Sequence, residues 1–163
     1  GFFPSTESSI ATQPVIETEL VCVTRKDHPL ARHAEIDLRQ LVGQTVAVVD
    51  HHLGATFNMQ QILHDALGNH GLITTNQSLA ALNMVVHGGA VAVLHPLTVP
   101  QHLLDILHVA RFEPREQVTF AIFYSRRRPL SRIVSKFMVA IRDSARVQGA
   151  LLDSMGIPFT VTM

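Results

Sequence analysis

Polar side chains that could bind a small molecule follow three separate apolar runs of the chain, which end at residues 49, 75 and 94. Carboxylate, imidazole, amide and hydroxyl groups in such places donate or accept hydrogen bonds to a small polar ligand. Helix capping explains two of these residues, Asn76 and Ser78, about as well. The candidate ligand-binding residues are Asp50, His51, His52, Asn76, Gln77, Ser78 and His95.

Catalytic and metal-binding chemistry has no comparable signal in the sequence. The chain has ten histidines, and no two of them stand three or four residues apart, the spacing at which a helix presents two metal ligands. No serine lies two residues after a glycine, which excludes the Gly-x-Ser-x-Gly nucleophile elbow. The glycine pair Gly88-Gly89 is not followed by the lysine of a phosphate-binding loop. We therefore expect no enzyme activity, no metal and no cofactor. A metal-dependent enzyme built on the histidines is the weakest alternative.

Composition describes a neutral, apolar chain. Its 163 residues include 13 basic and 13 acidic ones, and 47% of them are hydrophobic. A formal charge of zero argues against a broad basic face that grips nucleic-acid phosphates. The one cysteine, Cys22, excludes a disulfide framework and fits a reducing compartment. No apolar run is long enough to span a bilayer and the first residues lack a secretory signal, so we expect a cytoplasmic protein without membrane contact.

The one dense charge run is Arg126-Arg127-Arg128. Charge runs of this length are usually solvated turns. The alternative is an anion clamp, because arginine binds carboxylates with two parallel hydrogen bonds. Three residues are too few to predict a nucleic-acid patch.

Hydrophobic patterns predict strands that alternate with helices. Continuous apolar runs predict buried strands at 20–24, 45–49, 72–75, 90–94 and 118–124. Helical spacing or helix signals predict helices at 36–41, 56–67, 79–86 and 99–104, and a last helix capped by Ser131. Residues 1–19 are expected to form a loop. The expected core side of the last helix is Ile133, Val134, Phe137, Met138 and Ile141.

This alternation indicates an α/β fold with a mostly parallel sheet flanked by helices. Ligands of such sheets bind outside the carboxyl ends of the strands, near helix N-termini that offer free N–H groups. The candidate residues follow three of the predicted strands. The expected position of ligands at the carboxyl ends of the strands therefore selects the same residues as the hydrogen-bonding chemistry of the side chains does.

Four segments, taken together, resemble the effector-binding domain of LysR-type transcriptional regulators over residues 15–145. The segment 20–31 looks like a family strand that ends in His-Pro-Leu-Ala, and 36–41 is similar to the short helix after it. The segment 82–96 resembles the family's glycine pair, apolar run and Leu-Pro, although Ala90 replaces a glycine and His95 precedes Pro96. The segment 124–142 resembles the closing aromatic residue, basic turn, Leu-Ser and helix.

The resemblance implies a two-lobed fold like that of type II periplasmic binding proteins, with a ligand cleft between the lobes. Residues 43–123 would form the second lobe, and residues 1–42 and 124–163 the remainder of an incomplete first lobe. The opening Gly1-Phe2-Phe3-Pro4 looks like a point well inside the effector domain. The winged helix-turn-helix, the linker helix and the opening part of the first lobe would then be missing.

The function that the resemblance implies is ligand sensing by a bacterial transcription regulator. A small organic acid, with an aromatic acid as the finer expectation, would bind in the cleft and change the lobe or subunit arrangement. The partners would be this effector, further copies of the chain in a homodimer or higher homo-oligomer, and DNA only through the missing N-terminal domain. The alternative is a free-standing solute-binding protein of the same architecture.

Overall fold

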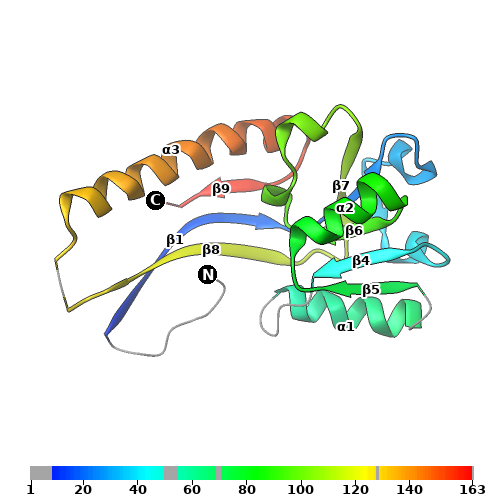
Figure 1. Cartoon of the computed structure of the whole chain (residues 1–163), viewed down its shortest axis with the longest axis horizontal. Coiled ribbons are helices and arrows are strands. Elements are labelled where there is room, and N and C mark those ends of the chain that lie inside the picture. Colours follow the sequence, from blue (N-terminus) through cyan, green and yellow to red (C-terminus); the bar gives the residue numbers. More distant parts are fainter. Residues whose placement is uncertain (1–8, 50–54, 69–70, 128, 163) are drawn as a thin grey trace. The chain divides into compact units, whose positions relative to one another are not determined.

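The computed structural model describes residues 9–49, 55–68, 71–127 and 129–162 (Figure 1). The chain divides into two compact units, one of residues 19–117 and one of residues 1–18 with 118–163. The predicted lobe boundaries at residues 43 and 123 differ from this division, because strands between residues 21 and 37 hydrogen-bond into the same sheet as those that follow. Those lobe boundaries remain a prediction.

The unit of residues 19–117 contains a six-stranded sheet in the order β3-β7-β2-β6-β4-β5. Three pairings are parallel, β3 with β7, β4 with β5 and β4 with β6, whereas β2 runs antiparallel to β6 and β7. The predicted mixed α/β fold with a parallel-rich sheet is confirmed. The strands are β2 (Val21–Arg25), β3 (Glu35–Asp37), β4 (Val46–Val49), β5 (Leu72–Thr75), β6 (Val91–Leu94) and β7 (Leu107–Glu113).

Two helices connect the parallel strands of this sheet. Helix α1 (Ala55–Leu67) leads from β4 to β5, and α2 (Ser78–Gly88) leads from β5 to β6. The strands on either side of β4 are reached by these two crossovers, so the helices lie on opposite faces of the sheet (Figure 1). Cover on both faces explains why every residue of β4 and β6 is buried.

Short 3₁₀ turns complete this unit at Pro29–Arg32, Leu38–Leu41, Pro96–Thr98 and Gln101–Leu103. The helix predicted at 36–41 is partly strand, since β3 takes residues 35–37 and the 3₁₀ turn begins at Leu38. The predicted helix at 99–104 is likewise a 3₁₀ turn. Strand β7 was not predicted, because His108 and Arg111 interrupt its apolar residues and leave no continuous apolar run.

The other unit contains a three-stranded sheet in the order β8-β1-β9, with β8 at Gln117–Ser125 and β9 at Phe159–Val161. The prediction of a loop over residues 1–19 is wrong for its described part, because Ile10–Glu19 forms β1. Residues 16–18 of β1 pair antiparallel with residues 159–161. A partner some 140 residues away along the chain leaves no local signal, and Pro14 argued against a strand.

Helix α3 (Arg132–Ser154) packs beside β9 (Figure 1). The predicted cap is confirmed: Ser131 Oγ accepts a hydrogen bond from Val134 N at 3.3 Å. The predicted core side is only partly correct: Met138 is buried and Ile141 half-buried, but Val134 is exposed, and Ile133 and Phe137 are 80% and 64% exposed. Two apolar stripes run along α3, and the tertiary packing buries the other one, which consists of Met138, Ala145, Gly149 and Leu152.

Candidate functional site

The parallel strands β4, β5 and β6 end at one edge of the six-stranded sheet. Val49 pairs with Thr75, and Val48 pairs with Val93, so the three carboxyl ends are level. The residues that follow them are Asp50, Asn76 and His95. The sheet edge selected from the sequence therefore exists. Asp50, His51 and His52 lie outside the described residues.

The turn from β5 into α2 places two candidate residues at the start of a helix. Thr75 Oγ1 accepts a hydrogen bond from Gln77 N at 3.0 Å and donates one to Gln77 O at 2.7 Å. Gln77 is the N-cap of α2, and its side chain makes no capping hydrogen bond. The expected cap by Asn76 or Ser78 is therefore wrong. Capping does not account for these two polar side chains, and the N-terminus of α2 keeps its positive dipole end without a side-chain cap.

His95 joins the end of β6 to the start of α2. Its Nε2 lies 3.4 Å from Ser78 Oγ, and Thr98 Oγ1 lies 3.1 Å from each of its ring nitrogens. His95 and Ser78 are half-buried, whereas Asn76 and Gln77 are exposed. The structure thus brings together Ser78, the first residue of α2, and His95, the residue after β6. Thr98 was not predicted as a site residue, because a threonine after Leu97 has no sequence feature that indicates binding.

The opposite end of α2 is fixed by Arg25 at the end of β2. Arg25 Nη1 donates to Val86 O at 3.0 Å, which places a cation at the negative end of the helix dipole. Its Nε and Nη2 also bind Asp27 at 2.9 and 2.8 Å. The hydrogen bonds from Arg25 lower the pKa of the Asp27 carboxyl. This contact holds the helix whose N-terminus lies at the candidate site.

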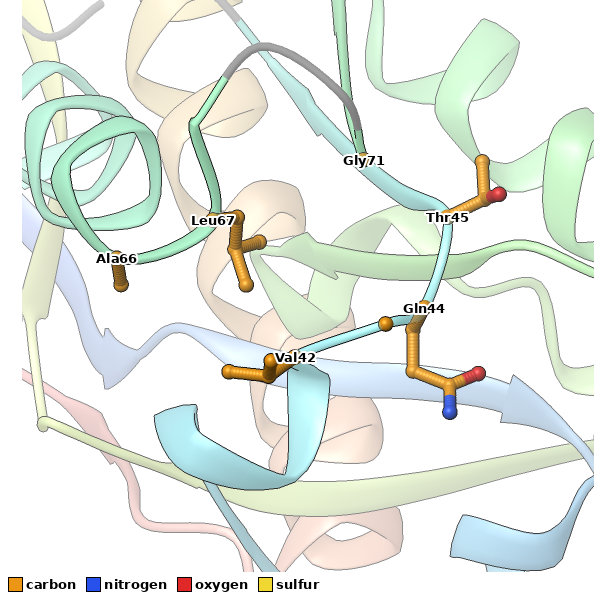
Figure 2. A pocket seen from close by; sticks show the side chains of 7 residues that line it. Val42, Gln44, Thr45, Ala66, Leu67 and Gly71 are labelled. Atoms are coloured by element: carbon orange, nitrogen blue, oxygen red, sulfur yellow. The ribbon is translucent and has the colours of Figure 1, made fainter.

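A second concave region lies at the other edge of the sheet, at the amino ends of β4 and β5 (Figure 2). It has a volume of about 200 Å³. The side chains of Val42 and Leu67 face it, and those of Gln44 and Thr45 turn away from it. The backbones of Gly71 and Gln44 approach closely here, since a Cβ on Gly71 would lie 2.8 Å from Gln44 O. The pocket is lined by Val42, Gly43, Gln44, Thr45, Ala66, Leu67 and Gly71.

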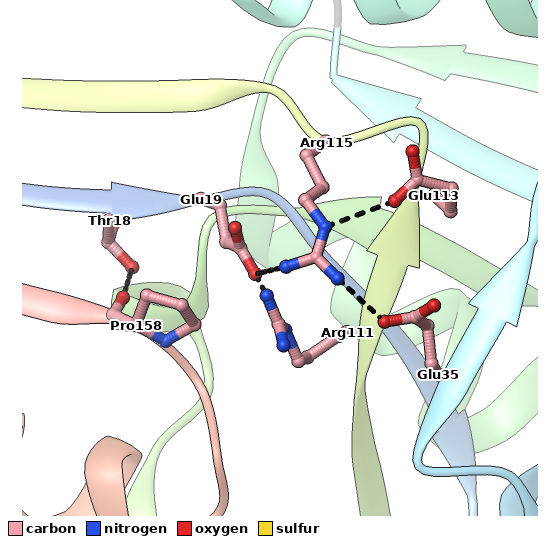
Figure 3. A network of polar contacts seen from close by, with 7 residues as sticks. All are labelled: Thr18, Glu19, Glu35, Arg111, Glu113, Arg115 and Pro158. Atoms are coloured by element: carbon pink, nitrogen blue, oxygen red, sulfur yellow. Dashed lines mark hydrogen bonds and ion pairs between the residues drawn. The ribbon is translucent and has the colours of Figure 1, made fainter.

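A charged network surrounds Glu19, just before β2 (Figure 3). Its carboxylate is nearly buried, and its Oε1 lies 3.0 Å from Arg111 Nε and 3.8 Å from Arg115 Nη1. Arg115 also pairs with Glu35 at 2.8 Å and with Glu113 at 3.1 Å. These residues are up to 96 positions apart in the sequence, so the network had no local signature. Val21, two residues after Glu19, pairs with Leu94, the residue before His95, and with Arg111, so the network lies at the same end of the sheet as the candidate residues.

Two sequence motifs have a structural explanation. Arg126 and Arg127 are exposed in a turn, with backbone N–H groups bonded to Ser9 O and Ser125 Oγ, while Arg128 lies outside the described residues.

Cys22 is fully buried in β2, and burial raises the pKa of its thiol. A thiol in this state is a poor nucleophile and a poor redox sensor.

The described residues contain no group of three or more His, Cys, Asp or Glu side chains placed to hold a metal ion. None of the helices in the described segments is both long enough and apolar enough to cross a membrane. What the site does offer is a hydroxyl pair, an imidazole and a helix N-terminus. This donor-rich set suits a small polar or anionic molecule.

The model of the LysR substrate binding domain matches residues 1–146. The chain belongs to the LysR substrate-binding domain family. Regulators of this family sense small-molecule effectors and act as oligomers, with DNA binding through an N-terminal domain, and their regulatory domains are generally non-enzymatic. A search among curated proteins gave no match.

Solved structures with the same fold are regulatory domains of this family. The reduced form of the OxyR regulatory domain from Pseudomonas aeruginosa is 23% identical, with a TM-score of 0.63 over 86% of this chain and 69% of that one. The CcmR regulatory domain of Synechocystis, in complex with 2-PG, is 18% identical, with a TM-score of 0.63 over 88% and 71%. The effector-binding domain of QuiR, in complex with shikimate, is 16% identical, with a TM-score of 0.62 over 87% and 69%.

The chain is shorter than these relatives. It spans about 70% of the regulatory domains just described and 46% of full-length OxyR from Pseudomonas aeruginosa.

Proposed function

We propose that this chain is the ligand-sensing domain of a LysR-type transcriptional regulator and binds a small organic acid at the carboxyl edge of β4, β5 and β6. The observation that carries the proposal is the pairing of Ser78 with His95 at the N-terminus of α2, where the N-cap residue Gln77 makes no side-chain capping hydrogen bond. The family match favours this role over that of a free-standing solute-binding protein.

The chemistry of this edge favours an acid as the effector. The first N–H groups of a helix and its dipole stabilise negative charge, and a hydroxyl and an imidazole add hydrogen-bond donors. Asn76 and Gln77 are exposed beside them and are available to a ligand. The complexes of QuiR with shikimate and of CcmR with 2-PG support a small acid as the class. An aromatic acid is the finer proposal.

Effector binding would act by shifting a conformational equilibrium. A ligand changes an equilibrium only as far as its affinities for the two states differ. In the proposed regulator, the shift is passed to a winged helix-turn-helix outside this chain, and the regulator works as a homodimer or higher oligomer in the cytoplasm. The cleft between two lobes that the resemblance implies, and contacts from Asp50, His51 and His52, remain parts of the proposal.

The test is a thermal-shift screen of the chain with aromatic and aliphatic carboxylic acids, followed by calorimetry of the acids that raise Tm. We expect the variants Ser78→Ala and His95→Ala to weaken binding of such an acid about tenfold each, as the loss of a hydrogen bond to a charged group does. His87→Ala, at the far end of α2, is the matched control and should bind normally. The proposal is overturned if no acid raises Tm, or if His87→Ala weakens binding as much as His95→Ala.

A further inference from the structure

His95 begins the short 3₁₀ turn Pro96–Thr98, and this turn places Thr98 against it. His95 is the N-cap of the turn, and Thr98 N donates a hydrogen bond to His95 O at 3.1 Å. Side chains three residues apart are eclipsed in a 3₁₀ turn. The backbone itself therefore brings the Thr98 hydroxyl close to the imidazole of His95.

Buried residues hold this turn in place. Pro96 stands at its first helical position, where the pyrrolidine ring fixes the φ angle, and its side chain is buried. Val99 is also buried, and Val99 N donates a hydrogen bond to Pro96 O at 3.1 Å. The position of Thr98 relative to His95 is thus set by the packing of the unit of residues 19–117.

The Thr98 hydroxyl lies over the face of the His95 ring. Thr98 Oγ1 is 3.1 Å from Nδ1 of the ring and 3.1 Å from Nε2. Within the plane of the ring, a point at this distance from both nitrogens would overlap the ring carbons. The oxygen therefore lies above the plane and contacts the ring from a direction in which no N–H or lone pair of the imidazole points.

Ser78 contacts the same ring from another direction. Ser78 Oγ lies 3.4 Å from Nε2, which is longer than most hydrogen bonds to nitrogen. A contact of this length restrains the ring weakly, and the χ2 torsion of histidine has broad preferences. The contact of Thr98 with the ring face adds the restraint on rotation that the Ser78 contact does not provide.

We propose that Thr98 is a positioning residue of the effector site. Its hydroxyl fixes the plane of the His95 imidazole, so that the Nε2 edge stays directed at Ser78, the first residue of α2. Thr98 acts through His95 and makes no contact of its own with the effector. This inference rests on the function proposed above, and it adds a residue and a role to that site.

The expected effect is smaller than that of removing the imidazole. Without the hydroxyl the His95 ring would rotate, and only part of the molecules would present the Nε2 edge at any time. A competent fraction of about one third to one half raises the apparent dissociation constant of the effector about two- to threefold. Thr98→Ala should show this loss, whereas Thr98→Ser keeps the hydroxyl and should bind as the natural chain does.

The first test observes the ring itself, with no ligand present, by nuclear magnetic resonance of protein with isotope-labelled histidine. The His95 signals are those that His95→Gln removes. In Thr98→Ala we expect the order parameter of the His95 Cε1–H bond to fall or its signal to broaden, and in Thr98→Ser we expect neither. The signals of His108, whose Nε2 lies 2.8 Å from His33 O, should stay unchanged and so exclude a general defect in folding.

The second test is calorimetric titration with shikimate, with benzoate and with the acids that raise Tm in the thermal-shift screen. For an acid that binds the natural chain, Thr98→Ala should weaken binding about two- to threefold, and Thr98→Ser should not. Thr45→Ala is the matched control. Thr45 is exposed just before β4, at the opposite edge of the sheet, and its side chain turns away from the pocket there (Figure 2).

Three outcomes overturn the role of Thr98 and leave the proposed function standing. The first is a His95 ring that is as ordered in Thr98→Ala as in the natural chain. The second is an acid that binds Thr98→Ala as tightly as the natural chain, and the third is a loss of affinity in Thr98→Ser as large as that in Thr98→Ala. If no acid binds the natural chain, the proposed function fails and the role of Thr98 fails with it.

Discussion

Gly149 of α3 lies directly against the aromatic ring of Phe159 on β9. A Cβ added at residue 149 would come within 2.5 Å of Phe159 Cδ1 and 2.9 Å of its Cε1. The absence of a side chain at this position lets the helix approach the strand, and Phe159, ten residues further along the chain, closes the contact.

The first prediction is that Gly149→Ala destabilises the protein by about 1–3 kcal/mol, because the ring must move within a packed contact. This loss exceeds the gain of up to about 1 kcal/mol that alanine brings to a helix interior. Gly88→Ala is the control: no atom lies within 4 Å of its added Cβ, so its stability should be unchanged or higher. Urea unfolding followed by circular dichroism measures both, and equal stability of the two variants would contradict the close contact.

The second prediction concerns two buried threonines of opposite effect. Thr24 Oγ1 on β2 is buried without a hydrogen-bond partner, whereas Thr18 Oγ1 on β1 donates to Pro158 O at 2.8 Å. Thr24→Val should raise the free energy of unfolding by about 1 kcal/mol. The substitution removes a hydroxyl whose burial without a hydrogen bond is unfavourable. Thr18→Val should lower it by about 1 kcal/mol. Thermal and urea unfolding of the pair decide the signs.

The third prediction tests the charged network around Glu19. Glu19→Ala leaves Arg111 without its buried partner and should destabilise the protein by about 3 kcal/mol, the usual cost of breaking a buried ion pair. Glu35→Ala removes a half-exposed partner of Arg115 and should cost less than about 1 kcal/mol. If the two substitutions have equal effects in urea unfolding, the carboxylate of Glu19 is not the centre of the network.

The fourth prediction is a pH dependence at Asp37, which caps the 3₁₀ turn Leu38–Leu41. The Arg39 side chain and then its backbone N–H hold the pKa of the Asp37 carboxyl below its ordinary 3.8. The carboxylate is therefore stabilising at pH values above 3.8, and its contribution is lost as the pH falls through the lower pKa of the folded state.

Asp37→Asn should thus be less stable than the natural chain at pH 7. This loss of stability should shrink below pH 3.8. Chemical unfolding at neutral and acidic pH measures it. A difference that stays constant down to the acid transition of the protein would show that the charge of Asp37 does not contribute. The neighbouring Gln40, whose Oε1 accepts from Asp37 N at 2.8 Å, is present in both proteins.

The sequence by itself predicted most strands and helices of the unit of residues 19–117, because the signals for them are local. Continuous apolar runs became β2, β4, β5 and β6 within one or two residues, and helical spacing gave α1 and α2. The parallel pairing that this alternation predicts puts Asn76 and His95 at one edge of the sheet, and the structure has them there. That this edge binds the effector is still a prediction.

Tertiary structure alone decided the features that depend on distant partners. Residues 10–19 became a strand because residues 159–161 pair with part of it, and Glu19 was buried because Arg111 and Arg115 come back to it. On α3 the sequence predicted one core side, which includes Ile133 and Phe137, whereas the packing of the helix buries Met138, Ala145, Gly149 and Leu152. Periodicity reports that a helix has an apolar side, but the choice between two such sides belongs to the surface that it meets.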